Sequence, residues 1–246
     1  MNIGLLTGLL ATVVTSLVSA DHIDNYLNDY NVEVLRSYQT ESMKDSGLEA
    51  LFTTTGILYA QREAGLLFTS PGELFHFSSS EPESETAAMK DEFLKVIPDK
   101  IVAQAPNEKL RIQVFTDISC PHCRDFHGRV PQYLEAGITV EFLLVAREGR
   151  TSLAYQQMSS LAFEDDQEKA LSDGMASGYL PRSEMASFQM AMHQQAAEII
   201  GIKGTPTVLY KGMDIGNLPP QQIGQAIIEV DEITNDTVVY DVTKYE

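Results

Sequence analysis

The chain has 246 residues, which is enough for one or two domains, and its apolar content of 43% is enough for a buried core. Its 35 acidic residues outnumber 17 basic ones, so the net charge is −18 at pH 7. This charge argues against a nucleic-acid partner and against binding to anionic membrane surfaces.

The first twenty residues, 1–20, have the pattern of a secretory signal. Ile3 to Val18 is an apolar run with small residues, and Val18-Ser19-Ala20 is a small-x-small cleavage site. No Lys or Arg precedes the run, so an uncleaved membrane anchor is the alternative. The run is short for a membrane span and holds several polar residues, which favours a cleaved signal. Export implies an oxidising compartment.

Residues 21–80 are predicted to form a small first unit of mixed α and β structure. Ile23, Tyr26, Leu27 and Tyr30 have helical spacing, and strand-like runs separated by glycines follow. These runs are Val32–Tyr38, Leu48–Thr55, Ile57–Gln61 and Leu66–Thr69. So small a unit has a thin core and often needs a partner chain.

Residues 81–98 are predicted to link this unit to a second one. Ser78 to Ser84 is rich in Ser, Glu and Pro, which is typical of a hinge. Glu85 to Ile97 has helical periodicity, and Pro98 ends it. We therefore expect a linker helix that acts as a spacer.

Residues 99–230 are predicted to form the second unit, in which strands alternate with helices. A helical insert of about 151–201 is broken by Gly174, Gly178 and Pro181. The other predicted elements are the strand Arg111–Thr116, the helical stretch Arg124–Leu134, the strand Ile138–Ala146, the strand Val208–Tyr210, the turn Lys211-Gly212 and the helix Pro219–Val230. Residues 231–246 are polar, and we expect a loose tail.

Cys120-Pro121-His122-Cys123 lies where the first strand of this unit gives way to a helix. These are the only two cysteines of the chain. A C-x-x-C motif at a strand-to-helix junction is the layout of a thioredoxin-like redox site. The helix N-terminus favours a thiolate, and His122 adds a donor or a positive charge. The pattern predicts that Cys120 is the nucleophile and Cys123 its resolving partner.

Two other interpretations of the motif carry less weight. Zinc or copper would need further ligands, but there is no second cysteine pair, and His22, His76, His127 and His193 are scattered along the chain. A purely structural disulfide closing so short a loop would add little stability. We therefore expect no metal and no cofactor.

Charged residues near the motif have less certain roles. Arg124 and Lys203 flank the site and are candidates to stabilise the thiolate, although solvated surface charges are at least as good an explanation. Asp117 would oppose the thiolate if it lay close, and the sequence assigns it no role.

Thr205-Pro206 lies just before a predicted strand, where proline is confined to a strand start, an edge or a turn. Beside a C-x-x-C motif, such a proline would press against the dithiol and leave nearby backbone free to pair with a peptide substrate. An ordinary turn proline is the alternative. The upstream motif favours substrate-binding roles for Thr205 and Pro206.

At these residues the chain resembles the DsbC/DsbG family of periplasmic disulfide isomerases. The resemblance is strongest from Lys100 to Phe126, including Val114-Phe-Thr-Asp-Ile-Ser-Cys-Pro-His-Cys123, and from Gly201 to Val208 around Gly-Thr-Pro. It is faint in residues 21–80.

The resemblance implies a thioredoxin-like domain with a helical insertion, preceded by a small N-terminal dimerisation domain and a linker helix. It also implies a homodimer with an apolar cleft for misfolded, disulfide-containing exported proteins. Within the site it implies a cis bond before Pro206, with Cys120 attacking. A membrane-bound thiol reductase would be the electron donor.

The chain departs from this family in its dipeptide Pro121-His122, which resembles that of the DsbA oxidases. A His at this position should make the disulfide more oxidising. The second disulfide of some isomerases is absent, and Phe163 stands near one of its positions. A dithiol oxidase is therefore the alternative function, and a holdase-type chaperone is a further one.

Overall fold

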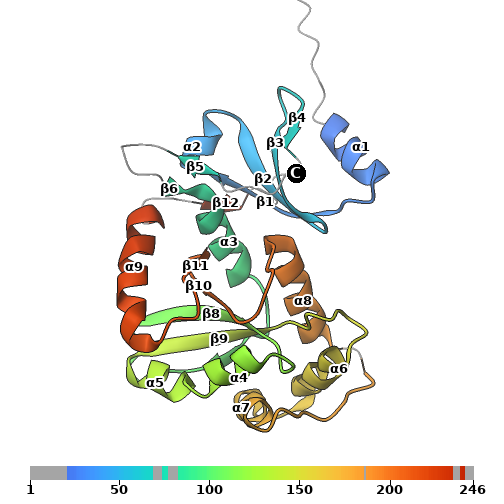
Figure 1. Ribbon diagram of the computed structural model, residues 1–246. Coiled ribbons are helices and arrows are strands. Elements are labelled where there is room, and N and C mark those ends of the chain that lie inside the picture. The colour runs from blue at the N-terminus through green and yellow to red at the C-terminus, as the bar shows by residue number, and fades with distance from the viewer. Residues whose placement is uncertain (1–20, 69–73, 77–82, 186, 235–238, 242–246) are drawn as a thin grey trace, which may run out of the picture.

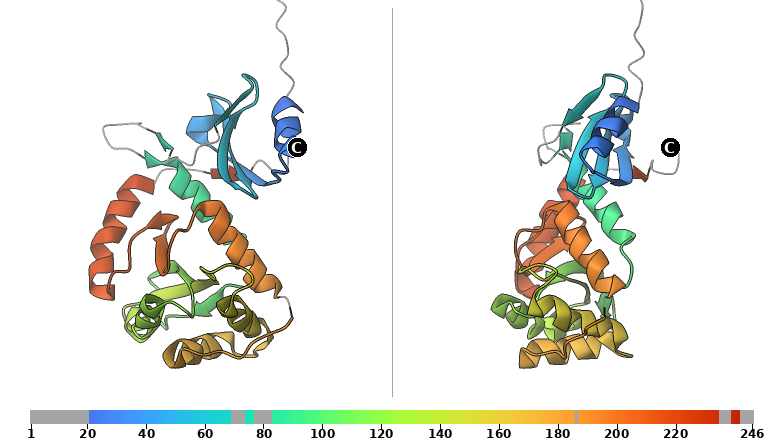
Figure 2. Two further views of the ribbon diagram at one scale, coloured as in Figure 1. Left: turned by 45° about the vertical axis from the view of Figure 1, so that its right-hand side comes forward. Right: turned by 90° about the vertical axis from the view of Figure 1, so that its right-hand side faces the viewer.

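The computed structural model describes residues 21–68, 74–76, 83–185, 187–234 and 239–241 (Figure 1). The predicted signal, residues 1–20, and most of the predicted hinge lie outside the described residues. Two five-stranded sheets stand one above the other, and helices α3 and α8 lie between them (Figures 1 and 2). Among the described residues no helix is both long and apolar enough for a membrane span.

The first sheet has the strand order β12-β1-β2-β3-β4, and every neighbouring pair in it is antiparallel. Its strands are β1 (Val34–Thr40), β2 (Leu48–Thr53), β3 (Gly56–Gln61), β4 (Leu66–Phe68) and β12 (Val239–Asp241). Helix α1 (Asp21–Asp29) packs on one face, and the short α2 (Glu41–Lys44) follows β1. A two-stranded pair, β5 (Phe75–His76) with β6 (Glu83–Ser84), leads into α3 (Glu85–Lys95).

The second sheet has the order β11-β10-β8-β9-β7, in which only β8 and β9 run parallel. Its strands are β7 (Ile101–Ala103), β8 (Leu110–Thr116), β9 (Ile138–Leu144), β10 (Thr207–Tyr210) and β11 (Met213–Asp214). The helices around it are α4 (Pro121–His127), α5 (Val130–Glu135), α6 (Leu153–Ser159) with the 3₁₀ turn Ser160–Phe163, α7 (Gln167–Ser177), α8 (Phe188–Ile200) and α9 (Pro220–Thr234). All seven residues of β9 are buried, as expected for a central strand covered on both faces.

Short-range signals in the sequence set the ends of the helices in this unit. The hydroxyls of Ser152 and Ser187 accept hydrogen bonds from the backbone N–H groups of Tyr155 and Met190, which caps α6 and α8. Helix α8 ends at Gly201, whose φ of 78° is in the left-handed region that glycine tolerates.

Alternation along the strands divides the interior into two main cores. One face of the second sheet, with Val114, Phe142 and Val208, packs against the helices of the second unit. The other face, with Phe115 and Leu143, packs against α3, α8 and the first sheet. This second core therefore joins the two units, and the first unit does not depend on its own thin core.

Helix α3 differs from the spacer that the sequence predicts. Met89 and Leu94 are fully buried, and Phe93 stacks on Phe52 of β2 at a ring-centroid distance of 4.9 Å. Ser84, predicted to lie in the hinge, is in strand β6 and is buried. The spacer prediction is wrong because apolar side chains of α3 pack against both the first and the second sheet, so the helix joins the two units instead of holding them apart.

The predicted loose tail is also wrong for the described part of residues 231–246. Helix α9 continues to Thr234, and Asp231 pairs with Lys211 at 2.7 Å. Strand β12 then hydrogen-bonds to β1 in the register Tyr38 with Asp241 and Thr40 with Val239. The segment is ordered because its backbone groups complete the edge of the first sheet, a partner two hundred residues away in the sequence.

Candidate active site

Cys120 is the residue immediately before α4, in the connection from β8. Its backbone is extended (φ −87°, ψ 117°), and Pro121 occupies the first position of the helix. The Cys120 N–H donates to the Asp117 carbonyl at 3.0 Å, and its own carbonyl accepts from the Cys123 N–H at 3.1 Å. One turn of helix therefore places both sulfurs at its start.

The peptide bond between Thr205 and Pro206 is cis, and this loop lies against the dithiol. The Cys120 thiol donates to the Thr205 carbonyl at 3.2 Å, across 85 residues of sequence. Within the described part of the chain the Thr205 hydroxyl is buried without a hydrogen bond of ordinary geometry. A sulfur anion would give this donor a partner.

The two thiols differ in their electrostatic surroundings. Burial alone raises the pKa of the Cys120 thiol, but the Cys123 N–H, the Thr205 side chain and the Arg147 guanidinium hold that pKa below its ordinary value. Burial raises the pKa of the Cys123 thiol to about 11, and a negative charge on Cys120 adds to the rise. Cys120 is therefore the sulfur that ionises first.

Asp117 ties this loop to the one that follows β9. Its side chain is fully buried, and its carboxylate accepts from the N–H of Ser119 at 2.8 Å and the N–H of Arg147 at 3.0 Å. The Arg147 Nε lies 3.1 Å from the same carboxylate, while Arg147 Nη2 lies 3.4 Å from the Ser119 hydroxyl. The Asp117 N–H also donates to the Cys123 sulfur at 3.4 Å. These donors offset the negative charge of Asp117, so its repulsion of a thiolate in the dithiol is reduced.

Sequence reasoning missed Arg147, although a signal for it exists. Strands β8 and β9 are parallel neighbours, so the residues just after their carboxyl ends meet at one edge of the sheet. Asp117 directly follows β8, and Arg147 comes shortly after β9. An acidic residue after β8 and a basic residue at the corresponding point after β9 would have predicted the ion pair between Asp117 and Arg147.

The other predicted residues occupy different positions around the site. Pro121 and His122 are exposed, and His122 makes no hydrogen bond or ion pair within the described residues, so its role in lowering the pKa stays a prediction. The Arg124 Nη1 donates to the Ile118 carbonyl at 3.0 Å. Lys203 is exposed on the loop before Thr205.

His127, considered above as a third metal ligand, lies in the core. Its Nε2 is 3.0 Å from the Thr116 hydroxyl, and its ring stacks on Phe142 at a centroid distance of 4.3 Å. Burial lowers the pKa of His127 to about 3, so the imidazole is neutral. Among the described residues no three His, Cys, Asp or Glu side chains are grouped to hold a metal ion.

Comparison with known proteins identifies similar chains. A family model described as a thioredoxin-like domain matches residues 97–241. The thiol:disulfide interchange protein DsbC of Dickeya dadantii is 32% identical over 186 residues, which cover 74% of this chain and 76% of that protein. The DsbC of Salmonella typhimurium is 31% identical and covers 82% of this chain and 84% of its own length.

A solved structure of lower similarity is a disulfide interchange protein from Neisseria gonorrhoeae. It is 24% identical, with a TM-score of 0.46, and covers 55% of this chain and 97% of its own.

Proposed function

The chain belongs to the thioredoxin-like family and to the DsbC thiol:disulfide interchange proteins within it, and on that premise we propose that Cys120 and Cys123 are its catalytic dithiol. Disulfide interchange and isomerisation are the activity of the chain. The observation that supports the residue assignment is the unequal acidity of the two thiols, with the pKa of Cys120 lowered and that of Cys123 raised to about 11.

The reaction follows from this inequality. The Cys120 thiolate attacks one sulfur of a wrong disulfide and forms a mixed disulfide, and the other substrate sulfur leaves as a thiolate. That thiolate can attack a different disulfide of the client and in the end release Cys120, which leaves the protein reduced. Alternatively, Cys123 loses its proton and attacks Cys120, which oxidises the protein and releases a reduced client.

Thr205, Pro206 and His122 complete the proposed site. The Thr205 carbonyl accepts a hydrogen bond from the Cys120 thiol, and the Thr205 hydroxyl is available to donate to a thiolate. Pro206 fixes the loop that carries this carbonyl beside the helix start. His122 is exposed, and its proposed role is contact with a client rather than with the protein interior.

Single-cysteine variants test the assignment. We expect Cys120→Ser to abolish the recovery of scrambled ribonuclease, because no other thiolate can form the mixed disulfide. Cys123→Ser should retain part of the isomerase activity but trap mixed disulfides, since the resolving thiol is missing. The measurement is ribonuclease activity against time, with the trapped complex followed by non-reducing electrophoresis.

Two results would contradict these proposals, the first the assignment of the dithiol and the second the isomerase function. Full isomerase activity in Cys120→Ser would remove the dithiol from the mechanism and leave the holdase function. A redox titration in which the protein rests oxidised in its native compartment would favour the dithiol oxidase.

A homodimer is proposed through the open edge of the first sheet. Among the described residues strand β4 pairs only with β3, and Leu66 and Phe68 in it are 51% and 50% exposed. An exposed apolar edge strand is a ready template for another chain. A second copy is its proposed partner, as the resemblance to dimeric isomerases implies.

We place the protein in the periplasm, with a membrane-bound thiol reductase as its electron donor and misfolded exported proteins as its clients. The apolar run Ile3 to Val18 and the Ala20 cleavage site support export. A mature protein whose first residue is Asp21, found by N-terminal sequencing of the exported form, would bear this out. An exported form that still carries residues 1–20 would favour the membrane anchor.

A further inference from the structure

Thr116 and His127 form a buried polar pair behind Cys123, and the proposed reaction does not use them. Thr116 is the last residue of β8 and is fully buried, and its hydroxyl lies 3.0 Å from the His127 Nε2. His127 follows Cys123 by four residues in α4, so both side chains lie on one face of that helix. The Thr116 side chain is also a hydrogen-bond partner of the Cys123 thiol. A chain of polar contacts therefore runs from the resolving sulfur through a hydroxyl to an imidazole.

The resolving step requires Cys123 to lose its proton in surroundings that oppose a charge. Burial raises the pKa of Cys123 to about 11. A negative charge on Cys120 adds to the rise, but in the mixed disulfide Cys120 is neutral. Burial is then the main obstacle, and hydrogen-bond donors at the Cys123 sulfur are what can oppose it.

Two groups in the loops after β8 and β9 act on this sulfur from fixed positions. The Asp117 N–H donates to it at 3.4 Å. The Arg147 guanidinium acts through its charge on both cysteines and is held by the Asp117 carboxylate. Because neither group can turn toward the sulfur, a donor that responds to the ionisation of Cys123 must be a side-chain hydroxyl.

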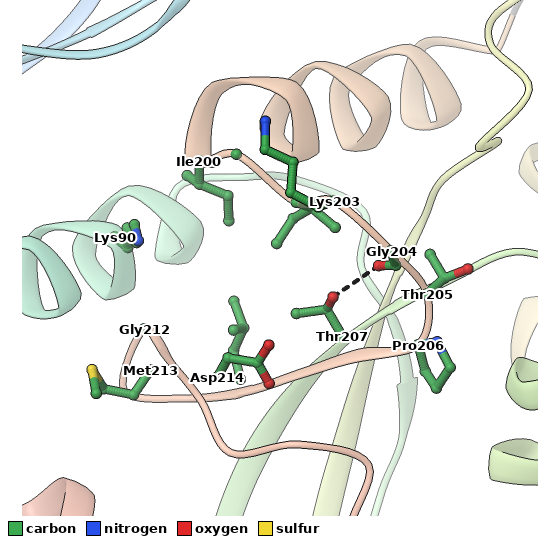
Figure 3. A pocket seen from close by; sticks show the side chains of 13 residues that line it. Lys90, Ile200, Lys203, Gly204, Thr205, Pro206, Thr207, Gly212, Met213 and Asp214 are labelled. Atoms are coloured by element: carbon green, nitrogen blue, oxygen red, sulfur yellow. Dashed lines mark hydrogen bonds between the residues drawn. The ribbon is translucent and has the colours of Figure 1, made fainter. Parts of the chain in front are cut away.

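The Thr205 hydroxyl is one such donor, but the two sulfurs share it. Figure 3 shows that it points away from the pocket that Lys203 and Asp214 line. The Thr205 side chain lowers the pKa of Cys120 as well as that of Cys123. A hydroxyl has one proton to donate, so Thr205 cannot serve both sulfurs at once.

The tautomer of His127 decides in which direction the Thr116 hydroxyl donates. Burial lowers the pKa of His127 to about 3, so the imidazole is neutral with one N–H, and it is too weak a base to keep the proton that Cys123 loses. Within the described residues its Nδ1 has no hydrogen-bond partner that would fix the tautomer. With the proton on Nε2, the imidazole donates to the hydroxyl, whose own proton is then free for the sulfur. With the proton on Nδ1, the hydroxyl donates to Nε2 and offers the sulfur only a lone pair, which favours the thiol.

We propose that Thr116 and His127 serve the resolving step: His127 is a positioning residue that orients the Thr116 hydroxyl, and this hydroxyl donates to the Cys123 sulfur as the thiol ionises. The inference rests on the proposed function, since it uses Cys123 as the resolving thiol. The Cys123 proton passes to water, the thiolate attacks the Cys120 sulfur, and the client sulfur leaves as a thiolate as the protein disulfide forms. The pair thereby sets how often a mixed disulfide ends in reduction of the client instead of rearrangement.

The symmetrical disulfide of thionitrobenzoic acid separates the two cysteines of the reduced full chain. Cys120 attacks the reagent and releases one thionitrobenzoate, and Cys123 then attacks Cys120 and releases the second, with the loss of two protons. Stopped-flow absorbance follows both releases, with protein in excess and at mildly acidic pH, where Cys120 still ionises and Cys123 hardly does. We expect Thr116→Val to slow the second release about threefold and to leave the first unchanged. Fewer Cys123 thiols ionise in this variant, and the higher nucleophilicity of a more basic thiolate offsets part of that loss.

Matched variants test whether the two residues act as one. His127→Phe keeps a ring against Phe142 and removes both nitrogens, so it should also slow the second release. The double variant should be no slower than the slower single one, because both residues act through one hydroxyl. Thr116→Ser keeps that hydroxyl and should retain the wild-type rate. Thr53→Val is the control and should keep both rates, since Thr53 is fully buried in β2 and its hydroxyl donates to the Gly56 carbonyl at 2.8 Å.

The outcomes distinguish the role of the pair from the proposed function. An unchanged second release in Thr116→Val and His127→Phe, an equal slowing of both releases, or additive effects in the double variant would overturn the role of the pair. If Thr116→Val does not fold, the two releases of His127→Phe decide. A wild type that releases only one thionitrobenzoate would contradict the proposed function, whereas a wild type that releases both, with variants that match it, would contradict the role of the pair alone.

Discussion

The pKa values of two thiols three residues apart are shifted in opposite directions because different neighbours surround the two sulfurs. Burial raises the pKa of both thiols, but at Cys120 the Cys123 N–H, the Thr205 side chain and the Arg147 guanidinium outweigh it. Arg147 is held in place by Asp117, whose buried carboxylate it shares with two backbone N–H groups. A buried acid close to the proposed nucleophile therefore assists the thiolate indirectly, by fixing a cation beside it.

Arg147→Gln is expected to raise the pKa of Cys120, because it removes the cation and leaves the Asp117 charge less compensated. The pH profile of alkylation by iodoacetamide measures this pKa. Arg147→Lys should restore part of the difference, since it keeps the charge. Arg124→Gln is the control, because that guanidinium donates to the Ile118 carbonyl. An unchanged profile in Arg147→Gln would show that the pair is only structural.

At the scale of elements, the hairpin of β10 and β11 is fitted against α3. Its turn residues Lys211 and Gly212 both have positive φ, 46° and 74°. A Cβ on Gly212 would lie 2.0 Å from the Ala87 carbonyl oxygen of α3. No side chain fits there, so the close contact between the helix and the hairpin depends on this glycine.

Gly212→Ala should lower the free energy of unfolding by about 2 kcal/mol or more, since both the backbone angle and the contact with α3 oppose a side chain. Urea unfolding followed by circular dichroism measures the change. Gly224→Ala in α9 is the matched control, because a Cβ there meets no atom within 4 Å. Its free energy of unfolding should rise by about 0.5–1 kcal/mol. Equal effects of the two substitutions would contradict the fitted contact.

Local patterns in the sequence predict the elements well and their partners poorly. Alternation and glycine turns identify β8, β9 and the Lys211-Gly212 turn, and the C-x-x-C motif identifies the start of α4. The burial of α3, the pairing of β12 and the position of Arg147 depend instead on contacts between distant parts of the chain. No periodicity within one segment contains that information, although the parallel β8 and β9 would have placed Arg147 beside Asp117.

At the scale of the whole molecule, the shared core connects the first sheet, which carries the proposed dimer edge β4, to the unit that holds the dithiol. The first sheet packs through Phe52 against α3, and the same core reaches Phe115 and Leu143 of the second sheet. A partner bound at β4 would therefore attach to a sheet whose core side chains also pack against the redox unit.

Phe68→Lys is expected to convert a dimer into a monomer, because it places a charge on the exposed edge of β4. Sedimentation equilibrium of the wild type should give twice the mass of one chain. Thr54→Lys is the control, since Thr54 is exposed in the turn between β2 and β3. A wild type that sediments as a monomer, or a Phe68→Lys variant that remains a dimer, would remove β4 as the interface.

Strand β12 has a consequence for how the protein is made. Synthesis proceeds from the N-terminus, so β1 emerges early, whereas the strand that pairs with its open edge, Val239–Asp241, comes after every other described element. During synthesis, the first sheet therefore has an unpaired edge at β1 until the last of its strands is made. A protein that corrects the disulfides of other proteins thus completes its own first sheet late, and its β1 edge can pair with other chains until the C-terminal strand is made.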